Sequence, residues 1–158
     1  APGMRLATLG WPSGNCRAAL AIGTSWRLQT ASMRATLKAL GQTPANRRVA
    51  VLGSMKELGD FAAKFHAQLT EPLSEAKVDF AVLVGEEMRS LAAELGKASA
   101  ASLGITHGFA HCDNPAEAIA ALKEFGITAG DAILVKGSNS IGLGALVSHF
   151  TGLERAGA

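Results

Sequence analysis

The fold is decided by the stretch Asp131-Ala-Ile-Leu-Val-Lys-Gly-Ser-Asn-Ser140. The short apolar run at 133–135 is typical of a strand that is covered on both faces of a parallel sheet. Gly137 permits a sharp exit from this strand, and Ser138 or Ser140 is suited to cap a following helix. Because ligands gather at the carboxyl ends of strands in open α/β sheets, we expect Lys136 and Ser138 on the ligand side.

Further strands and helices alternate before this stretch. Apolar runs predict strands at 18–22, 49–53, 78–84 and, more weakly, 106–112. Between them, helical spacing of apolar residues predicts helices over 31–40, 58–69 and 88–95, and a capping box, Asn114-Pro-Ala-Glu117, opens another. Thr30 and Gly41 are suited to the two ends of the first of these helices. This alternation predicts an α/β fold: a Rossmann-like three-layer sandwich with a mostly parallel sheet.

Composition indicates one globular domain that does not cross a membrane. The chain has 158 residues, of which 48% are hydrophobic, and no apolar run approaches the roughly 20 residues that span a bilayer. Cys16 and Cys112 are the two cysteines. Two cysteines make no disulfide framework, so a reducing cytoplasm is the expected compartment.

Charge is distributed unevenly along the chain. Residues 1–56 contain eight basic residues and no acidic residue, whereas the rest contains 7 basic and 13 acidic residues. Such asymmetry is found in domains whose basic half faces phosphate or nucleic acid. A basic surface without any binding role gives the same pattern, so both interpretations stay open at this point.

Several sequence motifs for phosphate, metal and nucleophile chemistry are missing. The chain has no G-x-x-x-x-G-K-[ST] motif and no G-x-G-x-x-G after a strand, so it lacks a phosphate loop of its own. His107, His111, Cys112 and Asp113 resemble metal ligands, but Phe109 lies between the two histidines on the same face of the predicted strand. We therefore predict no metal site there, and we interpret both cysteines as structural.

Strand ends remain as the places for a ligand. Gly53 ends the strand 49–53 and Ser54 follows it directly, whereas Val84-Gly85-Glu86-Glu87 has the form of an ordinary turn into a helix. Lys136-Gly-Ser138 differs, because ammonium, hydroxyl and helix N–H groups can converge there on a carboxylate or phosphate. A turn whose lysine is simply solvated is the alternative, and residue chemistry alone does not separate the two.

The segments resemble, in order and spacing, the C-terminal domain of the Mur ligase family. The match rests on Ser32–Leu40, Arg48–Gly53, Met55–Gly59, His66 and Leu134–Ser138. It covers about residues 31–150, so we divide the chain into an irregular or divergent N-terminal segment, 1–30, with a strand that leads into the domain, and a Mur-ligase C-terminal-like α/β domain, 31–158.

The resemblance implies a ligase domain of cytoplasmic peptidoglycan synthesis, a pathway of cell wall biogenesis that also sets cell shape. The expected reaction is ATP-dependent addition of D-alanyl-D-alanine to a UDP-N-acetylmuramoyl-tripeptide. Both substrates, and an upstream ATP-binding domain of the same protein, would be the partners. ATP and Mg would be the cofactors, held mainly by that central domain. Because this chain lacks the phosphate loop, we expect it to be inactive alone.

The resemblance also implies which residues face the ligands. Lys136, Gly137 and Ser138 would contact the substrate, with Gly53 and Glu57 at a neighbouring strand end. Before residue 31 the family shows an acidic stretch, D-S-Y-N-A-N-P, whereas this chain has Gly23-Thr-Ser-Trp-Arg-Leu-Gln-Thr30. Only Ser25 of that nucleotide-binding stretch is kept. A shifted reading frame before residue 31 and true divergence both account for this difference.

Two alternatives belong to other functional classes. A non-catalytic Rossmann-like module would use the basic N-terminal half to bind an anionic ligand or nucleic acid, with binding that weakens as salt is added. The equivalent domain of a folate polyglutamylating ligase would share the fold but act on another substrate.

Overall fold

The computed structural model describes residues 7–10, 17–21, 26–97, 100–127 and 131–137, together with Leu143 and Leu146. Side chains are described from Met33 onward, except at positions 56, 57, 100 and 101.

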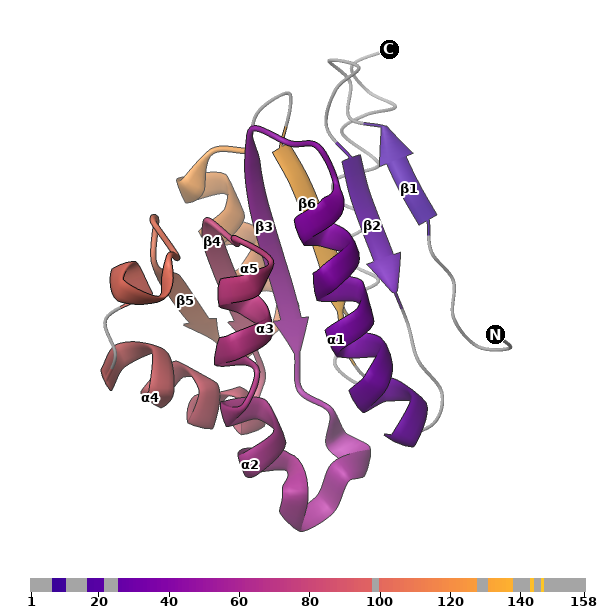
Figure 1. The fold of residues 1–158 in the computed structure, drawn as a ribbon. Coiled ribbons are helices and arrows are strands. Elements are labelled where there is room, and N and C mark those ends of the chain that lie inside the picture. Colours follow the sequence, from indigo (N-terminus) through magenta and orange to yellow (C-terminus); the bar gives the residue numbers. More distant parts are fainter. Residues whose placement is uncertain are drawn as a thin grey trace.

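A six-stranded sheet forms the centre of the domain, with the strand order β1-β2-β6-β3-β4-β5. Every neighbouring pair is parallel except β1 and β2, which are antiparallel at one edge. The strand predicted at 18–22 is therefore confirmed as Arg17–Ala21, and the N-terminal segment supplies a second strand, Ala7–Gly10, beside it (Figure 1). The strands are β1 (Ala7–Gly10), β2 (Arg17–Ala21), β3 (Arg47–Gly53), β4 (Phe80–Val84), β5 (Phe109–Cys112) and β6 (Asp131–Lys136).

Helices cover both faces of this sheet, as Figure 1 shows for α1 and α5 on opposite sides. None of the helices in the described ranges combines the length and apolar character needed to cross a membrane. The α-helices are α1 (Trp26–Gln42), α2 (Ala62–Ala67), α3 (Thr70–Glu75), α4 (Arg89–Lys97) and α5 (Pro115–Phe125), and the short 3-10 helices are η1 (Lys56–Phe61), η2 (Glu86–Met88) and η3 (Ala100–Leu103).

Alternate residues of the strands divide the core into two clusters, because successive side chains of a strand point to opposite faces. On one face, Leu52, Leu83 and Leu134 pack with residues of α1, α3 and α4. On the other face, Val51 and Val135 pack with α5 and with Leu143 and Leu146. This arrangement confirms the predicted three-layer α/β fold with a mostly parallel sheet.

The capping box at the start of α5 is confirmed. The Glu117 N–H donates to the Asn114 Oδ1 at 2.9 Å, and the Glu117 carboxylate accepts a hydrogen bond from the Asp113 N–H at 2.8 Å. Pro115 occupies the first helical position, where its missing N–H costs no hydrogen bond. The local sequence therefore fixes where this helix begins.

The prediction of one continuous helix over 58–69 is wrong. The chain there forms η1, then α2, and then α3 after a turn at 68 and 69. Gly59 has φ 56° and ψ −132°, a conformation that interrupts helical geometry and that glycine adopts most easily. Phe61, which the helical spacing places on a buried face, is consequently 76% exposed.

Two element boundaries also differ from the prediction. Helix α1 begins at Trp26 and ends at Gln42, so Thr30 and Gly41 lie inside it rather than at its ends. Strand β5 begins at Phe109, because residues 106 and 107 form a turn before it. Neither shift alters the topology.

Candidate functional site

Strands β3 and β6 lie side by side in the sheet, but the chain leaves them toward opposite faces. After β3, Met55 and Leu58 join the core cluster that α1 covers. After β6, Leu143 and Leu146 join the cluster that α5 covers. In open α/β sheets, such a switch point between neighbouring parallel strands is where ligands bind, outside the carboxyl ends of the strands. Lys136 and Gly53 lie at this point.

Lys136 is a fully buried lysine, with 0% of its surface exposed. It alternates with Ala132 and Leu134 along β6, which places it on the sheet face that α1 covers. Its Nζ has no hydrogen-bond partner within the part of the chain that the structure describes. Burial lowers the pKa of this ammonium, because the charged form loses its hydration. A merely solvated lysine is therefore excluded.

A buried ammonium without a partner is unstable, and an incoming anion would remedy that. Transfer of a charged group out of water is costly unless it is paired and hydrogen-bonded. A carboxylate or phosphate that reached Lys136 would supply both the opposite charge and the acceptor oxygens. The chemistry of the strand end therefore favours an anionic ligand, as the sequence predicts for Lys136.

Gly137 brings the ends of β6 and β3 into close contact. A Cβ atom added at Gly137 would lie 2.8 Å from the Gly53 Cα and 2.9 Å from the Leu143 Cδ1. Both are shorter than the contacts that real Cβ atoms make, and the first one is to backbone that cannot move aside easily. Gly53 and Gly137 thus act as spacers that let the two turns meet, in addition to any contact with ligand.

We expect the substitution Gly137→Ala to destabilise the chain by roughly 1–3 kcal/mol, because the new methyl group overpacks this contact. Urea unfolding followed by circular dichroism measures the difference. Gly96→Ala in α4 is the matched control, since a Cβ there meets nothing within 4 Å, and it should be stabilising by about 0.5–1 kcal/mol. Equal effects of the two substitutions would show that Gly53 and Gly137 are not in tight contact.

The turn after β3 is held from two sides. The Ser54 N–H donates to the Val84 carbonyl at 2.9 Å, and the Ser54 hydroxyl donates to the same oxygen at 3.3 Å. The Met55 N–H donates to Nε2 of His66 at 3.1 Å. His66 belongs to the ordered motifs of the sequence, but the spacing of 11 residues gave no sign that its ring binds this turn.

For three of the predicted site residues the structure describes no side chain. Glu57 lies in η1, and its side chain is outside the described part. Ser138 and Ser25 both lie outside the described residues. Their proposed contacts with substrate and nucleotide stay predictions, as does the role of Gly53.

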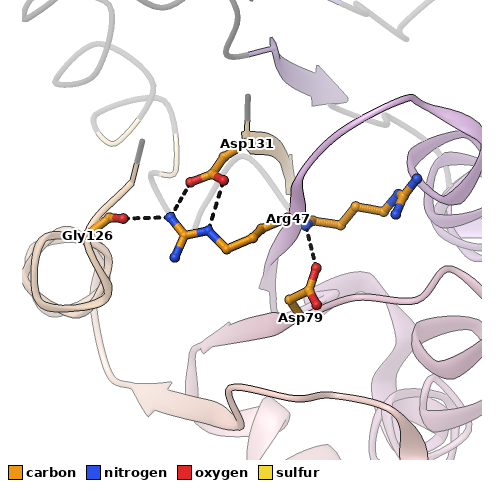
Figure 2. Close-up of polar contacts among 5 residues, drawn as sticks. Arg47, Asp79, Gly126 and Asp131 are labelled. Carbon is orange, nitrogen blue, oxygen red and sulfur yellow. Dashed lines mark hydrogen bonds and ion pairs between the residues drawn. The ribbon is translucent and has the colours of Figure 1, made fainter. Parts of the chain in front are cut away.

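A second polar cluster lies at the amino-terminal ends of the central strands β3 and β6, opposite the strand ends that carry Gly53 and Lys136 (Figure 2). The Arg47 guanidinium donates through Nε to the Asp131 carboxylate at 2.9 Å and through an Nη to the Gly126 carbonyl at 2.7 Å. It also lies 4.3 Å above the centre of the Phe125 ring. Asp79 accepts a hydrogen bond from the Arg48 backbone N–H at 2.8 Å. This cluster joins β3, β6 and the end of α5, so we assign it to stability.

The residues that resemble metal ligands are dispersed. His107 lies in the turn before β5 with its ring against Phe125, whereas the His111 Nε2 lies 2.8 Å from the Gly85 carbonyl oxygen. Among the residues that the structure describes, no group of three or more suitable side chains gathers to hold a metal ion. Cys112 is buried and free, and burial raises the pKa of its thiol, which disfavours a nucleophilic thiolate.

The sequence profile of a known family matches most of the chain. Residues 29–139 match the family described as "Mur ligase, glutamate ligase domain". The chain belongs to this family. A relative from Synechocystis sp., UDP-N-acetylmuramoyl-tripeptide–D-alanyl-D-alanine ligase, is 40% identical over 119 residues, which are 75% of this chain and 24% of the relative.

Solved structures of Mur ligases share the fold. MurF from Acinetobacter baumannii superposes with a TM-score of 0.68 at 21% identity, over 96% of this chain and 30% of that protein. MurF ligase from Thermotoga maritima, solved in complex with ADP, gives a TM-score of 0.63 at 19% identity, over 100% of this chain and 32% of that protein. The chain thus spans 24–32% of the length of these Mur ligases.

Proposed function

We propose that this chain is the C-terminal domain of an ATP-dependent ligase that adds D-alanyl-D-alanine to a UDP-N-acetylmuramoyl-tripeptide in peptidoglycan synthesis. The observation that carries the proposal is the 40% identity to the Synechocystis ligase over 119 residues. That stretch is three quarters of the chain, and the family match ends two residues beyond Gly137. The reaction would take place in the cytoplasm, an environment that suits the free thiol of Cys112.

The share of this domain in the reaction would be to hold the incoming dipeptide. D-Alanyl-D-alanine carries one carboxylate and one reactive amine. We assign the carboxylate to the buried ammonium of Lys136, whose Nζ is unpaired within the described residues. Held there, the dipeptide would keep its amine free to attack an activated carboxyl group of the tripeptide. Positioning of this kind lowers the barrier by replacing a chance encounter with a fixed geometry.

ATP and Mg would enter this reaction from outside the described residues. No set of three metal ligands is formed by those residues, and the sequence has no phosphate loop. They therefore do not fit a nucleotide–metal site on their own, and the ATP-binding part of the ligase would supply it. The nucleotide-linked muramoyl peptide would be the second substrate at the interface with that part.

Binding of D-alanyl-D-alanine to the 158-residue chain tests this assignment. In an NMR titration we expect the dipeptide to shift the amide signals of Gly53 and Gly137. Lys136→Met should weaken binding at least about tenfold, which corresponds to loss of one charge-assisted hydrogen bond. Lys38→Met, which removes an exposed lysine of α1, is the matched control and should leave binding unchanged. Equal binding by the wild type and Lys136→Met would contradict the assignment.

A turnover assay tests the division of labour between domains. With ATP, Mg and both peptide substrates, we expect no phosphate release from this chain alone, because phosphoryl transfer depends on a phosphate loop that the chain lacks. Phosphate can be followed by a coupled colorimetric assay. Turnover by the isolated chain above the background of a boiled sample would contradict the proposed role.

A glutamate-adding ligase is the second candidate, because the matching family is described as a glutamate ligase domain. Glutamate also carries the carboxylate that Lys136 would bind. The same NMR titration distinguishes the two: preference for L- or D-glutamate over D-alanyl-D-alanine would favour this candidate.

A further inference from the structure

His66 is buried in the core, with 0% of its surface exposed, and its ring makes a specific hydrogen bond. Nε2 accepts the Met55 backbone N–H at 3.1 Å. Because Nε2 acts as the acceptor, it carries no proton, and a neutral ring must then carry its proton on Nδ1. The protonation state of His66 is therefore fixed by a backbone donor in the turn after β3.

We propose that His66 is a positioning residue for the ligand site: its ring holds the turn 53–55 against Gly137 and so sets the place of the Lys136 ammonium. The proposal deepens the proposed function, on which it rests for the identity of the ligand. The positioning itself concerns contacts inside this chain and has readouts that need no ligand.

The path from the ring to the lysine consists of short contacts. His66 holds Met55, and the adjacent Ser54 is held by two hydrogen bonds to the Val84 carbonyl at 2.9 and 3.3 Å. Gly53, directly before them, lies so close to Gly137 that an added methyl group would be 2.8 Å from its Cα. Leu52 and Lys136 are also paired in the β3–β6 register. Because these contacts are tight, a displacement of the turn 53–55 would also displace the end of β6.

The surroundings of His66 favour the neutral ring. Burial lowers its pKa, and Glu87 in η2 offsets part of this effect, although the His66 Nδ1 has no hydrogen-bond partner among the described residues. Lys64, on the same helix, is exposed. A neutral ring can accept the Met55 N–H, whereas a protonated ring would present an N–H to another N–H. The local electrostatics thus maintain the form of His66 that holds the turn.

An ordinary core histidine would fill space without affecting the site. The two roles differ in what they require of the side chain at position 66. Space filling requires volume, which leucine supplies. Positioning requires an acceptor at the place of Nε2, which the side-chain oxygen of glutamine can reach and that of asparagine, one carbon shorter, cannot.

The experiment compares His66→Leu, His66→Asn and His66→Gln in the 158-residue chain by NMR. In the wild type, the ¹⁵N shifts of His66 should show a protonated Nδ1 and a bare Nε2. In His66→Leu and His66→Asn, the Met55 amide should exchange with solvent at least about tenfold faster, because its acceptor is lost. The pKa of the Lys136 side chain, measured by pH titration, should differ from the wild-type value in both variants. His66→Gln should restore wild-type behaviour in both measurements.

Three results would overturn the positioning role: a protonated Nε2 in the wild type, a Lys136 titration identical in all variants, or His66→Gln behaving like His66→Leu. The first needs no variant, so a variant that fails to fold does not prevent the test. D-Alanyl-D-alanine binding separates this inference from the proposed function. If the wild type does not bind the dipeptide but the pKa of Lys136 still differs between the wild type and His66→Leu, the proposed ligand is wrong and the positioning role stands.

Discussion

Replacing Lys136 by methionine is expected to make the folded chain more stable while it removes binding of the dipeptide. The ammonium is fully buried and has no hydrogen-bond partner among the described residues. An unsatisfied buried polar group costs about 1–3 kcal/mol, and a charged one costs more. Methionine has a similar length and no charge to desolvate, so we expect a gain of roughly 1–3 kcal/mol at neutral pH.

The gain should depend on pH in a defined direction. Burial lowers the pKa of Lys136 in the folded chain from its usual value of 10.5. Between these two pKa values the unfolded chain binds a proton that the folded chain does not, so the stability of the wild type rises with pH in that window. Lys136→Met lacks this rise. The advantage of the variant should therefore shrink as the pH increases toward 10.5.

Urea unfolding of both proteins from pH 7 to pH 10 measures this difference. His66, whose pKa is also lowered by burial, gives stability that is lost as the pH falls below its usual value of 6.5. That window is separate, and both proteins keep His66, so the difference between them isolates Lys136. Lys38→Met controls for the loss of one positive charge. A variant less stable than the wild type would mean that the folded chain does provide Lys136 with an anion.

Much of the fold follows from the sequence because it depends on local patterns. The apolar runs at 49–53 and 133–135 predict buried parallel strands, and the Asn114–Glu117 capping box predicts where α5 begins; the structure has both. Helical spacing is less reliable where a single residue changes the backbone. Gly59 interrupts the helix predicted around it, which leaves Phe61 exposed instead of buried.

The site could be predicted only in part, because its geometry depends on contacts between distant segments. The position of Lys136 at a strand end follows from the pattern around it, but its burial depends on the helix that covers that face of the sheet. The bond from Met55 to His66 depends on how the chain turns between them. Likewise, Arg47 and Asp131 are 84 residues apart and meet only because β3 and β6 are neighbours.

The second large effect that we expect is a loss of stability when the Arg47–Asp131 pair is broken. This pair lies at the amino-terminal ends of β3 and β6, away from the ligand site. The Asp131 side chain is completely buried and the Arg47 side chain is 24% exposed. Removing one member of a buried pair leaves the other charge without compensation, at a cost of about 3–5 kcal/mol. We expect this loss in Arg47→Met, because the Asp131 carboxylate would lose two hydrogen bonds to the guanidinium.

A double-mutant cycle of Arg47→Met, Asp131→Leu and their combination separates the energy of the pairing from the cost of burying each charge. Arg47→Met combined with Asp131→Leu removes both charges, and exchange of a buried pair for apolar residues is often close to neutral. We therefore expect the double variant to recover most of the stability lost in Arg47→Met, as measured by urea unfolding. Arg89→Met is the exposed control, since Arg89 and Glu86 are 71% and 66% exposed, and it should change stability by less than about 1 kcal/mol. Additive losses in the double variant would show that the two side chains stabilise the chain independently and not as a pair.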